Sequence, residues 1–118
     1  MSLMSWFRRK RERYSGLIEI ERDLVRVVLG HEATTMRWWD ILRIEAGRKP
    51  TATVDAFYVR LTDSGGYHLV ADDLMKRFSE LETAIFLRWP DIQQRWVQIY
   101  NGPPNKTEHE VLWQREAT

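Results

Sequence analysis

Cysteine is absent from this 118-residue sequence, which excludes disulfides, thiolate metal sites and cysteine nucleophiles. The apolar runs stay far below the roughly 20 residues that a membrane-spanning helix needs. The first residues contain no apolar segment followed by a cleavage site, so no signal peptide is expected. These absences predict a cytoplasmic protein, with association at a membrane surface as the alternative.

Recognisable catalytic or phosphate-binding motifs are also missing. No GxxxxGK[ST] or GxGxxG loop occurs, although such loops carry the usual phosphate cradles. His31, His68 and His109 lie in separate segments, whereas zinc requires three or four converging ligands. We therefore expect three surface histidines, no catalytic residue, no metal and no cofactor. The chain is predicted not to be an enzyme, and a small enzyme of unknown type is the weaker alternative.

Charge is distributed unevenly along the chain. Residues 1–16 contain five basic side chains against Glu12, a balance of +4, so the remainder carries −3 of the +1 total. Attraction to phosphate backbones would have to come from this tail, and no nucleic-acid partner is expected. The composition, 43% hydrophobic and 30% charged, is that of one globular domain, predicted over residues 17–118.

The basic tail combines aromatic and cationic residues. Residues 1–3 precede a second Met-Ser and are interpreted as a cloning remnant. The residues that follow could contact an anionic membrane weakly, with rings at headgroup level and cations on the lipid phosphates. The alternative is a flexible, solvated arm without a specific role. The candidate membrane-surface residues are Trp6, Phe7, Arg8, Arg9, Lys10, Arg11 and Arg13.

Strand-like runs fill the first part of the body. Alternating or β-branched segments predict strands over residues 17–20, 24–29, 34–39, 41–46, 57–62 and 67–71. Leu42, Ile44 and Ala46 are expected to share one face. Gly47–Pro50 is predicted to be a loop, because proline cannot donate to a strand ladder.

The hairpin signal at residues 57–71 is specific enough to predict register. A three-residue loop, Ser64 to Gly66, sets Leu61 opposite Leu69 and Val59 opposite Ala71, which keeps one face apolar. Glycine supplies the positive φ that such loops require.

After Ala71 the hydrophobic period changes to that of a helix. A long helix over residues 73–88 is predicted, packed through Leu74, Phe78, Leu81 and Ile85 and capped by Asp72 or Asp73. Trp89-Pro90 ends it. A shorter helix after Asp91 aligns Ile92, Trp96, Ile99 and Tyr100, and Val111–Trp113 is predicted to be a last short strand.

Two adjacent tryptophans suggest a recognition surface. On a strand, Trp38 and Trp39 point to opposite faces, so one is expected in the core and the other outside it; the sequence leaves open which. Exposed Trp and Arg dominate binding hot spots, which makes Arg37, Trp38 and Trp39 the candidate partner-binding residues. The alternative is that Trp89, Trp96 or Trp113 covers the outward ring.

The order of elements resembles small bacterial pleckstrin-homology-like domains. The resemblance rests on Trp39-Asp40-Ile41 followed by Ile44-Glu45-Ala46, a glycine-containing hairpin and a late amphipathic helix. With Leu112-Trp113-Gln114-Arg115 after Asn105-x-Thr107, the chain also resembles a group of uncharacterised bacterial proteins over residues 17–116. The resemblance implies no enzymatic activity. Phosphoinositide-binding members of this family bind their ligand with a basic first hairpin, whereas the corresponding turn in this sequence is Glu21-Arg22-Asp23. The resemblance therefore does not extend to inositol-phosphate binding.

Together these observations predict an α+β domain. It is expected to have a strongly bent antiparallel sheet or small barrel of six to seven strands, a long helix after the strands and a short second helix. The predicted function is a non-enzymatic binding or scaffold domain for a protein partner of unknown identity, with a homo-oligomer left open. The alternative is a peripheral membrane module steered by the tail.

Overall fold

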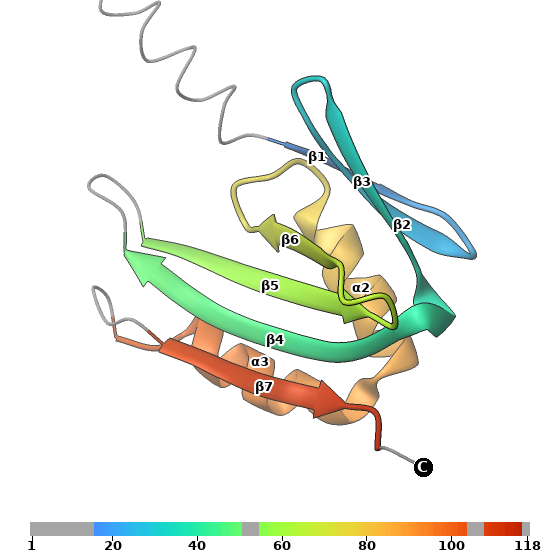
Figure 1. Cartoon of the computed structure of the whole chain (residues 1–118). Coiled ribbons are helices and arrows are strands. Elements are labelled where there is room, and N and C mark those ends of the chain that lie inside the picture. The colour runs from blue at the N-terminus through green and yellow to red at the C-terminus, as the bar shows by residue number, and fades with distance from the viewer. Residues whose placement is uncertain (1–15, 51–54, 104–107, 117–118) are drawn as a thin grey trace, which may run out of the picture.

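The computed structural model describes residues 16–50, 55–103 and 108–116 (Figure 1). This part of the chain contains seven strands in two antiparallel sheets and two α-helices, which confirms the predicted α+β class. The tail residues 1–15 lie outside the described residues. The elements are β1 (Leu17–Ile20), β2 (Leu24–Leu29), β3 (Glu32–Arg37), η1 (Trp38–Asp40), β4 (Ile41–Pro50), β5 (Asp55–Asp63), β6 (His68–Asp72), α2 (Phe78–Arg88), η2 (Pro90–Ile92), α3 (Gln93–Tyr100) and β7 (Glu108–Gln114).

The first three strands form a meander in the order β1-β2-β3. Alternation places Ile18, Val25, Val27 and Met36 in the core, and cross-strand pairing sets Val25 opposite Met36. The remaining strands form a second sheet in the order β6-β5-β4-β7. No ladder between the described strands joins the two sheets, so the small-barrel alternative is wrong.

Both helices pack on one face of the four-stranded sheet, which leaves its other face uncovered by any described element (Figure 1). Trp96 of α3 is completely buried in this layer. Its ring meets Phe57 of β5 at 5.1 Å and Phe86 of α2 at 5.1 Å between centroids. One aromatic side chain therefore ties both helices to the sheet.

The predicted hairpin is confirmed. Leu61 pairs with Leu69 and Val59 with Ala71. The Asp63 carboxylate accepts hydrogen bonds from the backbone N–H groups of Gly65 and Tyr67, and Gly66 adopts φ +81°. The loop closes as the sequence requires.

The first long helix begins later than predicted. Residues 73–77 are not helical: the backbone of Lys76 bonds to Gly16 and Ile18 beside β1, and Arg77 has φ +70°. The predicted caps serve other donors, because the Asp72 carboxylate accepts from Leu74 N–H and the Asp73 carboxylate from Phe57 N–H. The prediction that Leu74 packs in the core is therefore wrong, since it is 44% exposed, whereas Phe78, Leu81 and Ile85 are buried.

Strand β4 differs from its prediction at both ends. Gly47–Pro50 is part of the strand and pairs with β5 as far as Asp55. The ladder tolerates proline here because Pro50 is its last residue, so the missing N–H donor breaks no hydrogen bond further along. At the other end a register shift between Ile41 and Arg43 brings Ile41 into the core. Leu42 is consequently only half-buried, while Ile44 and Ala46 are buried as expected.

The short second helix and the last strand are confirmed. Ile92, Trp96 and Ile99 face the core, and β7 pairs with β4. Tyr100, predicted to share the apolar face, is 46% exposed, although its ring still meets Phe57 at 5.3 Å. Neither helix in the described part of the chain has the length and apolar content needed to cross a bilayer.

Candidate functional site: a tryptophan–arginine pocket

An open pocket of about 400 Å³ lies where the two sheets meet the end of α2 and the end of β7. Every lining side chain is an indole or a guanidinium. We call this site the tryptophan–arginine pocket; its residues are Arg22, Trp38, Trp39, Arg88, Trp89, Trp113 and Arg115.

Trp38 and Trp39 both belong to the short helix η1, whose turn points their side chains in different directions. The backbone N–H of Trp38 donates to the Asp23 carbonyl at 3.1 Å, and its indole Nε1–H donates to the Glu21 carbonyl at 3.0 Å. These bonds hold Trp38 inward, 5% exposed, whereas Trp39 is 56% exposed. One ring points inward and one outward, as predicted, but β3 ends at Arg37 and the separation comes from a 3₁₀ turn instead of strand alternation.

Arginines stack on both rings. The Arg88 guanidinium lies 4.3 Å from the Trp38 ring centroid, and the Arg37 guanidinium lies 5.4 Å from that of Trp39. Both distances are within the range for cation–π attraction, worth about 0.5–1 kcal/mol at exposed sites. The stacking holds Arg88 in the pocket lining and Arg37 against the outer ring without neutralising either cation.

The remaining wall comes from the C-terminal part of the chain. Trp89, directly after α2, packs against Trp113 of β7 with centroids 5.3 Å apart. Arg115 follows β7 and donates from Nη2 to the Trp39 carbonyl at 2.8 Å, which fixes the position of η1. The pocket thus joins segments far apart in sequence.

The predicted partner-binding residues lie together at this corner: Trp38 and Trp39 line the pocket and Arg37 lies over the outer ring. The alternative in which other tryptophans cover the outward ring is wrong, because Trp39 remains more than half exposed; Trp89 and Trp113 stand beside it, and Trp96 lies in the core. Sequence reasoning missed Arg22, Arg88 and Arg115. These three arginines reach the tryptophans only through the tertiary structure, and no pattern in the local sequence indicates that they belong to the site.

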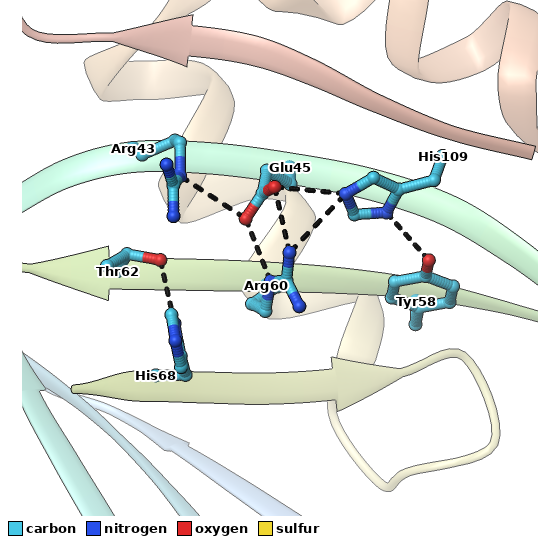
Figure 2. Close-up of polar contacts among 7 residues, drawn as sticks. All are labelled: Arg43, Glu45, Tyr58, Arg60, Thr62, His68 and His109. Carbon is cyan, nitrogen blue, oxygen red and sulfur yellow. Dashed lines mark hydrogen bonds and ion pairs between the residues drawn. The ribbon is translucent and has the colours of Figure 1, made fainter. Parts of the chain in front are cut away.

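A second cluster lies on the uncovered face of the four-stranded sheet (Figure 2). The Glu45 carboxylate of β4 is nearly buried, the residue being 4% exposed. It accepts two bonds from Arg60, at 2.8 and 2.9 Å, and lies 3.4 Å from Nε of Arg43 and 2.9 Å from Nε2 of His109. The Tyr58 hydroxyl completes the chain at 2.8 Å from Nδ1 of His109.

Charge pairing explains the ionisation of this cluster. The hydrogen bonds from Arg60 outweigh the cost of burial, and with the help of His109 they lower the pKa of Glu45 from 4.5 to about 2. Burial raises the pKa of the Tyr58 hydroxyl. Glu45 is thus an ion-pair centre bonded to β5 and β7, and its charge is already satisfied by its partners.

The Tyr58 hydroxyl, the His109 imidazole and the Glu45 carboxylate are hydrogen-bonded in the order of a proton relay. The relay ends on a phenol with a raised pKa, which is a poor nucleophile at neutral pH, and its carboxylate is fully engaged. Sequence reasoning treated His109 as a plain surface histidine and missed this cluster. His68, by contrast, makes one side-chain hydrogen bond, to Thr62 at 2.9 Å.

Within residues 16–50, 55–103 and 108–116, no three His, Cys, Asp or Glu side chains converge as a metal site would require. Comparison of the chain with protein-family models, with curated proteins and with solved structures finds no match.

Proposed function

We propose that this chain is a non-enzymatic binding or scaffold domain of pleckstrin-homology-like type that recognises a protein partner through the tryptophan–arginine pocket. The proposal rests on one observation: Trp39 is 56% exposed, beside three tryptophans of the pocket that are better buried. A large ring held rigidly at the surface loses little entropy on binding, and such rings dominate the energetics of interfaces.

The chemistry of the lining favours binding over catalysis. The pocket offers indoles and guanidiniums but no carboxylate, imidazole or hydroxyl side chain, so it lacks a general base and a nucleophile. Seven strands in two antiparallel sheets support the pleckstrin-homology-like assignment, whereas β7 after the helices goes beyond the usual pattern. A cytoplasmic location is part of the same proposal.

Affinity capture with three matched baits tests this function: the natural chain, Trp39→Ala and Leu87→Ala. Leu87 is a suitable control because it is an exposed apolar residue, 77% accessible, on α2. Proteins retained by the natural chain and by Leu87→Ala but lost with Trp39→Ala would be partners of the pocket. An anchor of this kind contributes about 2 kcal/mol, roughly a thirtyfold change in Kd. Identical retention by all three baits would refute the proposal.

The basic tail supports a second candidate function, a peripheral membrane module. Five cations and two aromatics within residues 6–13 suit weak, reversible attachment to anionic lipid. Co-sedimentation with phosphatidylserine vesicles, with and without residues 1–15, tests it. Binding that depends on the tail and falls between low and physiological salt supports this function; salt-independent binding, or none at low salt, rules it out.

A further inference from the structure

Two groups of arginines in the described part of the chain differ in their partners. The first group forms ion pairs with glutamates, and its members lie on both sheets, immediately before α2 and on α3. These are Arg26 with Glu19, Arg43 and Arg60 with Glu45, Arg77 with Glu80, and Arg95 with Glu110.

The arginines around the tryptophan–arginine pocket have no such partner among the described residues: Arg22, Arg37, Arg88 and Arg115 form no ion pair there. All four are exposed. Within the described ranges, Glu21, Asp23 and Glu116, which are adjacent to Arg22 and Arg115 in sequence, form no ion pair with them. The Asp40 side chain accepts a hydrogen bond from the Ser64 hydroxyl and forms no ion pair with these four arginines.

Backbone carbonyls orient two of these cations. Arg88 donates from Nη1 to the Ala84 carbonyl and from Nη2 to the Arg22 carbonyl, each at 3.0 Å, while Arg115 donates to the Trp39 carbonyl. A guanidinium has five N–H donors, so both retain donors for a ligand. Positioned cations that form no ion pair, beside an exposed ring, are complementary to an anionic group attached to an apolar one.

We propose that the pocket binds an acidic peptide segment, with carboxylates between the guanidiniums and an adjacent apolar side chain on Trp39. The inference rests on the proposed function and specifies its partner. Two other occupants fit less well. The chain's own tail carries +4 and would be repelled, and a membrane needs several protruding apolar groups, whereas Trp38 is 5% exposed and Trp39 alone of the four indoles is exposed by more than half.

The test uses the full chain labelled with ¹⁵N and follows the indole N–H signals, assigned by single Trp→Phe substitutions. The probes are three eight-residue peptides that share two leucines and differ only in the other residues: all glutamate, all glutamine or all lysine. The glutamate peptide should shift the Trp39 signal and saturate, and the glutamine peptide should bind at least roughly tenfold more weakly. The lysine peptide should not bind.

Two matched variants locate the charges. Arg22→Gln/Arg37→Gln/Arg115→Gln should weaken glutamate-peptide binding roughly tenfold or more, with the indole spectrum of a folded protein retained. Arg26→Gln/Arg77→Gln/Arg95→Gln removes the same charge elsewhere and should change Kd less than about threefold. Equal losses in the two variants would show a diffuse charge effect and overturn the proposal.

The remaining outcomes separate this inference from the function on which it rests. If glutamate and glutamine peptides shift Trp39 with equal affinity, the pocket binds peptides but the acidic specificity is wrong. If no peptide shifts Trp39 and capture is also independent of it, both proposals fail. If phosphatidylserine vesicles shift Trp39 and no peptide does, the pocket contacts lipid and the acidic-peptide proposal is overturned.

Discussion

The hydroxyl of Tyr58 and Nδ1 of His109 lie 2.8 Å apart although strand β4 runs between them. Both residues pair with Gly47 on the intervening strand, and their rings stack at 5.9 Å with an interplanar angle of 20°. A side chain at position 47 would separate them. The missing Cβ is therefore what allows a contact across three strands.

Gly47→Ala should destabilise the protein. An added Cβ would lie 2.3 Å from the Glu108 carbonyl oxygen and 2.6 Å from the Tyr58 hydroxyl, and a backbone atom cannot move aside cheaply. We expect a loss of about 1–3 kcal/mol, measured by urea unfolding. Gly65→Ala is the control, because its closest new contact is an exposed Tyr67 carbon at 3.1 Å. Equal effects of the two substitutions would contradict this account.

Glu45→Gln should remove an acid-sensitive contribution to stability. The folded pKa of Glu45, about 2, lies below its ordinary value of 4.5, so its contribution is complete above pH 4.5 and is lost as the pH falls toward 2. The loss at pH 7 should be about 2–3 kcal/mol, because solvent screens the partners, whose side chains are 34–37% exposed.

Unfolding at pH 7 and at pH 3 checks the Glu45 prediction, since the difference between natural and variant chains should shrink at the lower pH. Glu80→Gln is the control. Glu80 is an exposed partner of Arg77, with its own side chain 54% accessible, so this substitution should lower the free energy of unfolding by less than about 1 kcal/mol. A Glu45→Gln effect that is independent of pH would mean that packing, not charge, sets its role.

Glu82→Gln should stabilise the protein at neutral pH. The Trp96 indole donates to the Glu82 carboxylate at 2.9 Å, and burial raises the pKa of that carboxyl. A raised folded pKa means that stability falls as the pH rises through it. Glutamine keeps an acceptor without the partly buried charge, so the melting temperature of the variant should exceed that of the natural chain at pH 7. Near pH 4 and below the gain should shrink toward zero; a gain unchanged down to pH 3 would argue against the assignment.

Trp38→Ala and Trp39→Ala should separate stability from recognition. Truncating the buried Trp38 removes its packing and its bond to Glu21, and should cost about 3–5 kcal/mol. Truncating Trp39 should change the free energy of unfolding by about 1 kcal/mol or less. Denaturant unfolding of both variants provides the measurement, and comparable losses would show that Trp39 is a packing residue.

Local patterns predicted the elements whose partners are close in sequence. The hairpin register followed from Gly66 and from the alternation of Val59 and Leu61. The start of α2 could not be predicted, because Asp72 and Asp73 have good capping chemistry and only the pairing of Lys76 with β1 shows that the helix starts later. Strand character at Gly47–Pro50 likewise depends on β5 and β7 as neighbours.

The same distinction applies to the candidate sites. Residue type alone selected Arg37, Trp38 and Trp39, since exposed Trp and Arg favour recognition. Arg22 and Arg88 are brought together by the contact between the end of α2 and the β1–β2 turn, whereas Arg115 and His109 depend on β7 lying beside β4. That pairing joins residues 45 and 109, and no short-range signal encodes it.

The pocket also bears on how a ligand could be found. Its walls come from the β1–β2 turn, η1, the end of α2 and the end of β7, so it exists only when both sheets and the C-terminal strand are in place. Any molecule that occupies it must favour the complete fold over the unfolded chain, by about 2.7 kcal/mol at a hundredfold excess over Kd. Thermal-shift screening would therefore report occupancy directly, before the identity of the natural partner is known.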